Sequence, residues 1–470
     1  MSSTNTRTAM EHLLADLRAR PVVVYSLGVE GRDLARWLLA RGARVTMSDT
    51  RTAEQLAAAG AFPPPGVERT VVGQPFIEPD GFALVAVSQS VLRSDPVIAR
   101  ARSLGIPVVS QMQLLLRLAT PRRVIGITGS SGKSTTTALV GEIARRSRPA
   151  VLVGGNLGEP LLERIETAPL QADVVLEISH TQLQYTDRSP AIAAVTNVTP
   201  NHLDQFTWDE YVDLKRRITA YQSAEDIAVL NADDPVTSGF AAGLPSTVWR
   251  VSTRGAIPGP GAWREYDAIA VRSADGRVER VLPVHALRLR GEHNVANAVT
   301  AAAIAAAAGY PTEAIAEVLA SFRGLPHRLQ VVGTVRGVRY VDDSIATTPE
   351  RTIAALRSFE EPIVLLLGGR EKHLPLERLR EEAGARCRAA VCFGEAGPLF
   401  AEALQDTVRT VLVPDLASAV ERAAALARPG DTVLLSPAAT SFDAYPNFAA
   451  RGEAFAALVR TLPGFEEAEA

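Results

Sequence analysis

The sequence predicts an α/β protein with three domains. Its length of 470 residues is typical of about three domains. Apolar runs of strand length alternate with helical patterns along most of the chain, which is typical of parallel sheets covered by helices. One glycine-rich segment, Ile127–Thr137, lies between such a strand and such a helix. We therefore place the domains at residues 1–118, 119–324 and 325–470.

The N-terminal domain is predicted to be Rossmann-like. A strand, a turn, a helix and a second strand are predicted at Pro21–Ser26, Leu27–Gly31, Arg32–Gly42 and Arg44–Ser48. This βαβ order is that of a nucleotide-binding crevice, although Ser26 replaces the first glycine of the usual fingerprint. Asp49 follows the second strand, where a carboxylate either holds a ribose hydroxyl or caps the next helix. The segment is therefore either a nucleotide-binding unit or a scaffold of the same shape.

The glycine-rich segment predicts a phosphate-binding loop in a central, P-loop ATPase-like parallel sheet. Gly129 and Gly132 allow the backbone to approach phosphates, and the N–H groups at the start of the following helix point towards the anion. Lys133 can reach the terminal phosphates, and Ser134 can bind Mg²⁺. Ile127 stands where the strict pattern has its first glycine, so the motif is a shortened variant. We expect the chain to bind a nucleoside triphosphate here rather than to form an ordinary glycine–serine turn.

Further strands are predicted on both sides of residue 324. In the central domain they lie in residues 172–179, 191–198 and 227–234. The Gly- and Pro-rich stretch Ala256–Trp263 is expected to be a surface loop. In the C-terminal domain, strands are predicted at Arg339–Val341, Pro362–Gly368, Ala389–Phe393, Thr410–Val413 and Thr432–Ser436. Helical segments separate these strands, so this domain is also predicted to be Rossmann-like.

The composition excludes several classes of protein. A net charge of −3 gives no global reason to expect binding to nucleic acid or to an anionic membrane. No apolar run reaches the roughly 18 residues of a membrane span, and the N-terminal segment lacks the apolar centre of a signal peptide. The two cysteines, Cys387 and Cys392, suit packing better than a metal site or a disulfide. We therefore expect a cytoplasmic protein.

Three residues outside the loop could carry chemistry. Glu177 closes an apolar predicted strand, where a carboxylate can bind the metal ion on the phosphates or serve as a capping or ion-pairing group. His202 follows another strand and, taken alone, is more often a structural histidine. Lys215 lies on a predicted helix beside Arg216 and Arg217, which favours a solvated face. These alternatives stay open on the residues alone.

An ordered series of motifs covers nearly the whole chain. Those of the central part are TGSSGKST (128–135), Gly154–Gly158, Leu176–Ser179, NVTPNHLD (197–204) with Lys215, Asn231–Asp234 and Gly291–Asn297. Those of the C-terminal part are Pro326–Arg328, Asp342–Ser344, LLLGGREKH (365–373) and LLSPAATSFDAYPNF (434–448). The series resembles that of the Mur ligase family, the ATP-dependent enzymes that build the peptide of bacterial cell-wall precursors. The last two motifs are similar to those of members that use D-glutamate.

The resemblance implies a ligase that works through an acyl phosphate. ATP phosphorylates the carboxylate of a nucleotide-linked substrate, the amino group of an amino acid attacks it, and a tetrahedral intermediate collapses to an amide, ADP and phosphate. The implied partners are the small molecules ATP, UDP-N-acetylmuramoyl-L-alanine and D-glutamate, with two Mg²⁺ ions as cofactors. We expect a monomer that binds neither nucleic acid nor a membrane.

The resemblance also implies roles for individual residues. The implied catalytic residues are Lys133, Asn156, His202 and Lys215, and the implied metal ligands are Ser134, Glu177, His202 and, if carbamylated, Lys215. The implied ATP-binding residues are Gly129, Ser130, Ser131, Gly132, Lys133, Ser134, Thr135, Asn297, Arg328 and Asp342. The UDP-substrate residues are Val29, Asp49, Thr50 and Arg51, and the D-glutamate residues are Thr347, Lys372, Ser441, Phe442 and Phe448.

The chain departs from the family pattern at four places. Ile345 replaces a lysine in the Asp-Ser-Lys-Ala-Thr motif of the D-glutamate members, so one cation is missing. Residues Ser179–Leu183 read Ser-His-Thr-Gln-Leu where the family commonly has Ser-Ser-Phe-Gln-Leu. Ser88–Ser90 replaces the Ser-Pro-Gly turn that meets the diphosphate, and Glu30 would repel a diphosphate. The alternatives are a paralogue with another amino acid or nucleotide substrate, and a weakly active, ATP-binding regulatory homologue.

Overall fold

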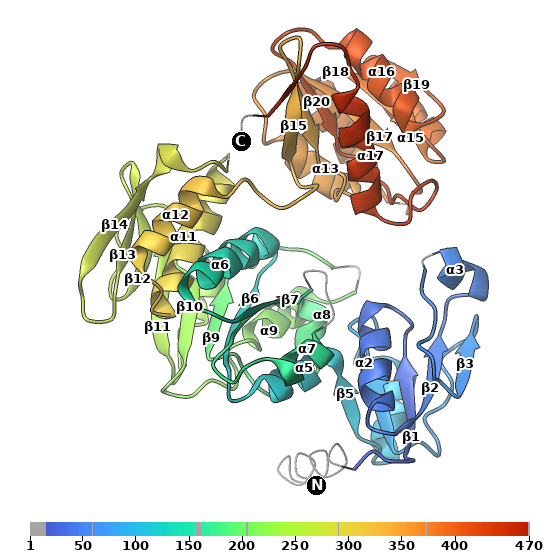
Figure 1. Ribbon diagram of the computed structural model, residues 1–470, viewed down its shortest axis with the longest axis vertical. Helices are drawn as coiled ribbons and strands as arrows, with labels where there is room; N and C mark the ends of the chain where they lie inside the picture. The colour runs from blue at the N-terminus through green and yellow to red at the C-terminus, as the bar shows by residue number, and fades with distance from the viewer. Residues whose placement is uncertain are drawn as a thin grey trace. The chain divides into compact units, whose positions relative to one another are not determined.

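The computed structural model describes residues 16–58, 60–156, 161–203, 205–289, 291–371 and 374–468. The chain forms two compact units, Met1–Phe322 and Arg323–Ala470. The described residues of the first unit form two sheets, and those of the second form one (Figure 1). The predicted α/β class with parallel-rich sheets is confirmed. The predicted domain limit at residue 118 lies within the first unit and stays a proposal.

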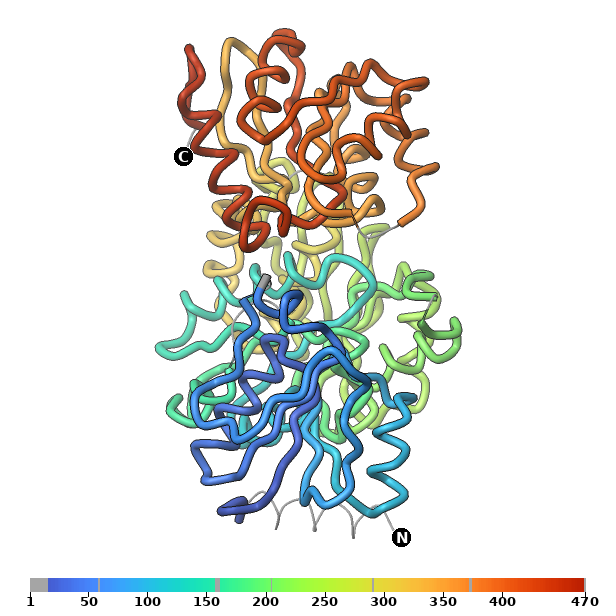
Figure 2. The backbone as a smooth tube through the Cα atoms, turned by 90° about the vertical axis from the view of Figure 1, so that its right-hand side faces the viewer, coloured from blue at the N-terminus to red at the C-terminus, as the bar shows by residue number. Residues whose placement is uncertain are grey.

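The first sheet consists of parallel strands in the order β3-β2-β1-β4-β5 (blue in Figure 2). The strands are β1 (Pro21–Tyr25), β2 (Arg44–Asp49), β3 (Arg69–Val72), β4 (Leu84–Val87) and β5 (Val108–Ser110), and the helices are α2 (Val29–Leu39), α3 (Ala53–Ala58), α4 (Pro96–Ser103) and α5 (Gln111–Ala119). Val22 and Val24 pack with α2 and α5, while Val23 and Tyr25 pack with α4 on the other face. The strand order reverses between β1 and β4, so the loops after these strands form the edge where such sheets bind ligands.

Helix α2 begins earlier than predicted. Val29, Glu30 and Gly31 form its first turn rather than the end of the turn after β1. A Cβ atom on Gly31 would lie 1.8 Å from the carbonyl oxygen of Ser26, so only glycine lets the helix start this close to the strand. The helical spacing of apolar residues becomes visible only from Leu34 onwards, which is why the pattern placed the start too late.

The central sheet has the order β14-β13-β12-β11-β10-β9-β6-β8-β7. The strands are β6 (Arg123–Thr128), β7 (Val151–Gly155), β8 (Asp173–Glu177), β9 (Ile192–Val195), β10 (Ile227–Asn231), β11 (Thr247–Ser252), β12 (Gly261–Glu265), β13 (Ala268–Arg272) and β14 (Val278–Pro283). The helices are α6 (Lys133–Ser147), α7 (Leu162–Thr167), α8 (His180–Leu183), α9 (Trp208–Arg216), α10 (Pro235–Gly239), α11 (Glu292–Ala307) and α12 (Thr312–Ser321), with a 3-10 turn at Val284–Ala286. Strands β6 to β12 pair in parallel, whereas β13 and β14 add an antiparallel edge that was not predicted.

Both faces of the central sheet are covered by helices. Ile125 and Ile127 of β6 pack with α6, α11 and α12, while Val124 and Leu176 pack with α5 and α7 on the opposite face. Most of the alanine-rich part of α11 is buried, because small side chains let this helix pack closely against α6. The carboxyl end of β6, which leads into the glycine-rich segment, is therefore held between two buried layers.

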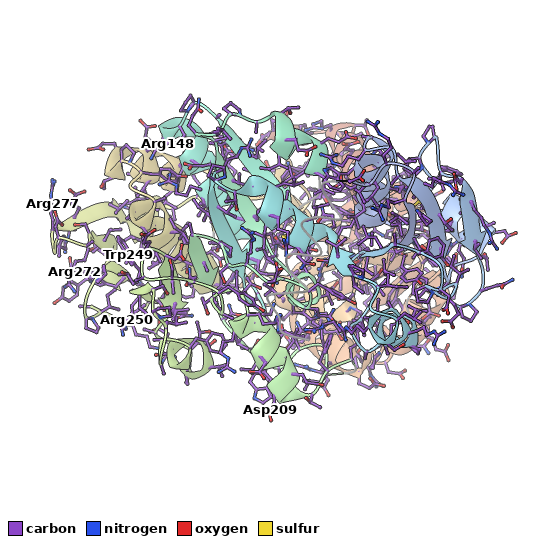
Figure 3. The ribbon with its side chains drawn as sticks, turned by 90° about the horizontal axis from the view of Figure 1, so that it is seen from below. Arg148, Asp209, Trp249, Arg250, Arg272 and Arg277 are labelled. Carbon is purple, nitrogen blue, oxygen red and sulfur yellow. The ribbon has the colours of Figure 1, made fainter. Side chains whose placement is uncertain are left out.

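The Gly- and Pro-rich stretch Ala256–Trp263 is not wholly a loop, contrary to the prediction. Its last residues begin β12, and Trp263 is only 2% exposed. The guanidinium group of Arg272 lies 5.0 Å from the centroid of the Trp263 ring, which is a cation–π distance. Figure 3 shows Arg272 with Arg250 and Arg277 at the β11–β14 end of the sheet. The clustered glycines and prolines concealed the start of this strand.

The sheet of the C-terminal unit has the order β19-β18-β17-β20-β16-β15-β21. The strands are β15 (Gln330–Val335), β16 (Val338–Asp342), β17 (Ile363–Gly368), β18 (Cys387–Phe393), β19 (Thr410–Leu412), β20 (Thr432–Leu435) and β21 (Phe465–Glu467). Helices α13 (Pro349–Leu356), α14 (Glu377–Arg386) and α15 (Gly397–Leu404) cover one face, and α16 (Leu416–Leu426) and α17 (Phe448–Arg460) cover the other. In Figure 2, α17 is the dark red helix at the left edge of this unit. The predicted strands are confirmed, whereas the antiparallel edge strands β15 and β21 were not predicted, because Gly333 interrupts one and the other is short.

Two features of the structure concern the cysteines and the possibility of a membrane span. Cys387 and Cys392 both lie in β18 as free thiols, and burial raises the pKa of each to about 12. A thiol with such a pKa stays protonated at neutral pH and is a poor metal ligand. Among the described residues, no helix combines the length and the apolar character needed to cross a membrane.

Candidate active site

The glycine-rich segment forms a phosphate-binding loop between β6 and α6, as predicted. Gly132 precedes Lys133, the first residue of α6, with a φ of 79°, and Gly129 has a φ of 150°. A Cβ atom on Gly129 would lie 1.9 Å from Thr196 Oγ1, and one on Gly132 would lie 2.2 Å from Asn297 Oδ1. Only glycine fits both positions. The loop therefore presents backbone N–H groups at a helix start, which is an anion-binding geometry.

The loop is braced by the segment that follows β9. Asn197 accepts hydrogen bonds from the backbone N–H groups of Ser130, at 2.8 Å, and Ser131, at 3.0 Å. The Ser130 hydroxyl donates to the Thr199 carbonyl oxygen and lies 3.0 Å from the Tyr211 hydroxyl. These bonds fix the loop without using the N–H groups that begin α6. Of the remaining predicted phosphate-binding residues, Ser134 and Thr135 lie in the first turn of α6.

Two lysine side chains meet at one carbonyl oxygen of the loop. Lys133 Nζ donates to the Gly129 carbonyl oxygen at 2.8 Å, and Lys215 Nζ donates to the same oxygen at 2.9 Å. Lys215 is only 1% exposed, which excludes the alternative of a solvated face. Burial, and then the charge of Lys133, set the pKa of Lys215 well below its usual value. A buried lysine beside a second cation favours the neutral amine.

Glu177 brings a carboxylate to the loop. It ends β8 opposite Ile127 of β6 and is 2% exposed. Its Oε1 accepts a hydrogen bond from Asn156 Nδ2 at 2.7 Å, while Oε2 has no hydrogen-bond partner among the described residues. A buried carboxylate oxygen without a donor is costly unless a cation binds it. The donor set therefore fits Mg²⁺, which prefers oxygen ligands.

The wider surroundings also suit a cation that is shared with phosphates. The described residues contain no group of three or more His, Cys, Asp or Glu side chains arranged for a metal ion. Mg²⁺ in nucleotide sites usually takes one or two protein carboxylates and completes its shell with water and phosphate oxygens. The absence of a closed protein cage in this part of the chain is compatible with such a site.

His202 lies in the loop after β9 with a φ of 54°, and its ring centroid is 4.2 Å from that of His180. Burial, followed by the charges of Lys215, His202 and Lys133, lowers the pKa of His180 to about 3. His180 is thus a neutral imidazole beside the loop. Sequence reasoning did not select this residue, although it is one of the departures in the segment after Glu177.

The predicted UDP-substrate residues gather at the carboxyl edge of the first sheet. Asp49 accepts hydrogen bonds from the Leu27 N–H group at 2.6 Å and from the Arg51 guanidinium at 2.7 and 2.9 Å. Burial alone would raise the pKa of Asp49, but these bonds lower it overall. Thr52, rather than Asp49, caps α3. Val29 is 49% exposed at the start of α2, and the intervening Thr50 is also exposed.

Glu30 of α2 lies at the edge where the strand order of the first sheet reverses, and its carboxylate contacts the segments that follow β4 and β8. Its Oε2 accepts from the backbone N–H of Gln89 at 2.6 Å, and its Oε1 accepts from Gln182 Nε2 at 2.5 Å. Burial raises the pKa of Glu30, and these hydrogen bonds oppose that increase. The side chain predicted to repel a diphosphate is thus engaged with the turn that replaces the Ser-Pro-Gly segment.

In the C-terminal unit, the predicted residues lie at the carboxyl ends of β16 and β20. Asp342 accepts from the Ser344 N–H group at 2.9 Å and lies 2.7 Å from His327 Nδ1, an interaction that raises the pKa of the histidine. The half-buried Arg328 follows His327, and Thr347 precedes α13. Ser441 is buried, whereas Phe442 and Phe448 are 43% and 36% exposed. Lys372 lies outside the described residues.

Sequence reasoning missed Arg451 of α17. This arginine is fully buried and donates to the Ser344 hydroxyl at 2.9 Å and to the carbonyl oxygens of Ser344, Gly368 and Ala439. It therefore ties together the segments that follow β16, β17 and β20, which carry the predicted D-glutamate residues. An arginine on an otherwise apolar helix face was the available signal.

The stability of the chain should depend on pH through Asp343. This carboxyl group is buried against the Leu329 N–H group and the Ser436 hydroxyl, and burial raises its pKa from 3.8 to about 7. The pKa of Asp343 is therefore higher in the folded protein than in the unfolded chain. Its contribution to the free energy of unfolding is complete below about pH 4 and is lost as the pH rises through about 7.

Asp343→Asn should remove this loss, which amounts to at most roughly 4 kcal/mol. Urea unfolding of wild type and variant between about pH 4 and pH 8 checks this prediction. Identical pH slopes would show that Asp343 has no such effect.

Comparisons with known proteins agree with this geometry. Residues 127–305 match the Mur ligase middle domain, and residues 327–439 match the Mur ligase glutamate ligase domain. The chain is 40% identical over 461 residues to the UDP-N-acetylmuramoylalanine–D-glutamate ligase of Symbiobacterium thermophilum, covering 95% of this chain and 99% of that protein. It is 39% identical to the protein of that name from Anaeromyxobacter dehalogenans, covering 94% of this chain and 98% of that protein.

The fold resembles that of the UDP-N-acetylmuramate-alanine ligase of Thermotoga maritima, with a TM-score of 0.57 and 19% identity. The similarity covers 94% of this chain and 99% of that chain.

A phosphate-binding loop at the carboxyl edge of a parallel sheet, with a buried carboxylate on the neighbouring strand, defines a nucleotide-dependent P-loop protein. The two matched domains and the near full-length relatives narrow this class. The chain belongs to the Mur ligase family and is an ATP-dependent, amide-bond-forming ligase.

Proposed function

We propose that this chain joins D-glutamate to UDP-N-acetylmuramoyl-L-alanine at the expense of ATP, in the synthesis of peptidoglycan precursors. The relatives that are 40% and 39% identical over nearly their full length carry the name of this activity. The observation that carries the proposal is the arrangement at the loop. There, Lys133 and Lys215 share the Gly129 carbonyl oxygen, and Glu177 Oε2 finds no donor in the described part of the chain.

The use of lysine supports this assignment. Of the 49 lysine and arginine residues, only Lys133, Lys215 and Lys372 are lysines, and each lies in a motif shared with the family. Lysine offers a compact charge on a flexible stem and an amine that can lose its proton when buried, and arginine offers neither. We therefore infer that the function of these three positions requires an amine and not a guanidinium group.

The reaction requires ATP because a carboxylate is a poor acyl donor. An oxygen of the substrate carboxylate attacks the γ-phosphorus, and ADP leaves with the electron pair of the broken P–O bond. The amine of D-glutamate then attacks the carbonyl carbon, and the tetrahedral intermediate expels phosphate while the nitrogen loses a proton. Water must be excluded because it would hydrolyse the acyl phosphate.

We assign the triphosphate to the loop and the start of α6. Backbone N–H groups within residues 129–135 would bind its oxygens, and Lys133 would leave the loop carbonyls to neutralise the transferred phosphoryl group. Asn156 would face the reacting carboxylate, and Asn297, which packs against Gly132, would contact ATP. The ATP roles of Arg328 and Asp342 remain predictions from the resemblance.

Two Mg²⁺ ions are proposed as cofactors, and when bound they would neutralise charge on the phosphate oxygens. Ser134 and Glu177 would hold the first, and His202 with a carbamylated Lys215 would hold the second. The lowered pKa of Lys215 supports the modification, because only a neutral amine attacks CO₂ to form a carbamate. The product is an oxygen ligand in place of a cation.

The remaining substrate assignments follow the three-part division of the chain. Residues 1–118 would hold the UDP end, with Val29, Asp49, Thr50 and Arg51 at the edge of the first sheet. The central part, 119–324, would hold ATP. The part 325–470 would hold D-glutamate through Thr347, Lys372, Ser441, Phe442 and Phe448.

The proposal predicts a strict dependence on both acceptor and donor. Purified protein with Mg²⁺ and ATP should release phosphate only when UDP-N-acetylmuramoyl-L-alanine and D-glutamate are both present. A panel of other amino acids in place of D-glutamate provides the control. Phosphate release that does not require D-glutamate, or that is faster with another amino acid, would overturn the assignment.

A weakly active regulatory homologue is the second candidate, and Ile345 favours it because this residue replaces a lysine. Arg351 of α13 donates to the Ile345 carbonyl oxygen at 3.1 Å, and we infer that its guanidinium group could take the place of the missing cation. A guanidinium group therefore lies at the turn from which the lysine is missing, which favours an active ligase.

A further inference from the structure

Gln89 links the first sheet to the carboxylate at the phosphate-binding loop. Gln89 Nε2 donates to Asn156 Oδ1 at 3.2 Å, and Asn156 Nδ2 donates to Glu177 Oε1 at 2.7 Å. On its other side, Gln89 Oε1 accepts from the hydroxyl groups of Ser179, at 2.8 Å, and Thr181, at 3.1 Å. A continuous series of hydrogen bonds thus runs from the turn after β4 to Glu177.

The directions of these bonds determine one another. Glu177 Oε1 accepts from the NH₂ group of Asn156, so the oxygen of Asn156 is turned towards Gln89. Gln89 must then offer its own NH₂ group to Asn156, which leaves its oxygen for the two hydroxyl groups. The Ser179 oxygen accepts from the Gln182 N–H group at 3.0 Å, and the hydroxyl hydrogen of Ser179 is left to donate to Gln89. Glutamine is the residue that satisfies this pattern on both sides.

The backbone of Gln89 is fixed as well. Its N–H group donates to Glu30 Oε2, and Gln182 donates to the other oxygen of Glu30. Proline, which the family commonly has at this place, offers neither the N–H group nor the amide side chain. Glu30 and Gln89 are therefore complementary departures, and Glu30 holds the turn that carries Gln89.

We propose that Gln89 is a positioning residue that fixes the amide of Asn156 and, through it, the orientation of Glu177 towards the metal–nucleotide complex. This inference rests on the proposed function. Glu177 Oε1 is held by Asn156, which leaves Oε2, without a donor among the described residues, for a cation. Groups that orient a metal-binding side chain typically change metal affinity or activity by about 10- to 100-fold.

The test compares Gln89→Met and Gln89→Glu with a matched control. Gln89→Met removes the amide, while Gln89→Glu keeps the acceptor for Ser179 and Thr181 but cannot donate to Asn156. Gln184→Met is the control, because Gln184 also joins the two sheets, through the Arg93 N–H group at 3.0 Å, and makes no bond to Asn156 or Glu177. Thermal unfolding verifies that all three variants are folded.

Calorimetric titration of ATP at increasing Mg²⁺ concentration gives a readout that does not require turnover. Both Gln89 variants should need about tenfold more Mg²⁺ for half-maximal ATP binding, and their kcat should fall by a similar factor, whereas Gln184→Met should stay within about twofold of wild type. An unchanged Mg²⁺ requirement, with only the KM of the UDP-substrate raised, would make Gln89 a substrate contact and overturn the inference. The Mg²⁺ dependence of ATP binding tests the role of Gln89 without turnover. If the wild-type protein showed no D-glutamate-dependent turnover, that result would refute the proposed function but would leave the role of Gln89 to the binding measurement.

Discussion

Lys133→Ala should lower kcat by about 100- to 1,000-fold, because it removes the cation that neutralises the transferred phosphoryl group. Lys133 Nζ is held by the carbonyl oxygens of Gly129 and Ser130 at 2.8 and 3.2 Å, so the side chain is already at the loop before ATP arrives. Lys133→Arg should lose most activity as well, since a planar guanidinium group does not fit the place of a compact ammonium group. Steady-state kinetics with saturating UDP-substrate and D-glutamate measure both effects.

Arg145→Ala provides the control for this prediction. Arg145 lies near the end of α6, where it pairs with Glu142 and is half-exposed, so the variant removes a cation from the same helix away from the loop. Its kcat should stay within about twofold of wild type, since exposed ion pairs contribute little. Wild-type turnover of Lys133→Ala would contradict the claim that this loop binds the triphosphate for catalysis.

Lys215→Ala should lower kcat by about 100-fold, because it removes the proposed carbamate ligand. Lys215 is nearly inaccessible, donates to Thr128 Oγ1 and to the Gly129 carbonyl oxygen, and has a strongly lowered pKa. If the carbamate is required, the wild-type protein should lose activity when CO₂ is removed and regain it when bicarbonate is added. The alanine variant should respond to neither treatment.

Isotope-labelled bicarbonate makes the modification directly observable. The small number of lysines in the chain limits the possible carbamates, and the NMR signal expected in wild type should be absent from Lys215→Ala. Arg216→Ala is the matched control, because Arg216 is exposed on the same helix and pairs with Asp213. A carbamate signal that persists in Lys215→Ala, or no signal in active wild-type protein, would exclude Lys215 as the carbamylated residue.

The parts of the site that sequence reasoning located lie where a strand ends. The phosphate-binding loop follows an apolar strand and precedes a helix, so both its place and its backbone geometry are encoded locally. Glu177 is similar, because an acid that closes a buried strand must lie at the carboxyl edge of a parallel sheet. Neither inference requires knowledge of contacts between distant segments.

Other features depend on contacts that local patterns do not encode. Lys215 has arginine neighbours and resembles a surface residue, yet the turn of α9 directs it into the loop. The bond between Gln89 and Asn156 joins residues 67 positions apart, and Arg451 contacts Ser344 across 107 positions. Such pairs become visible only when the sheets are assembled. The same holds for the antiparallel edges, since β13, β14, β15 and β21 owe their pairing to neighbouring strands.

Transfer of oxygen-18 tests the central claim most directly, which is that ATP activates the substrate carboxylate by phosphorylating it at this loop. UDP-N-acetylmuramoyl-L-alanine with both carboxylate oxygens labelled is incubated with the protein, ATP, Mg²⁺ and D-glutamate, and the phosphate released is analysed by mass spectrometry. If the acyl phosphate forms, each phosphate carries one labelled oxygen and the amide retains the other. Unlabelled phosphate accompanying amide formation would contradict the account.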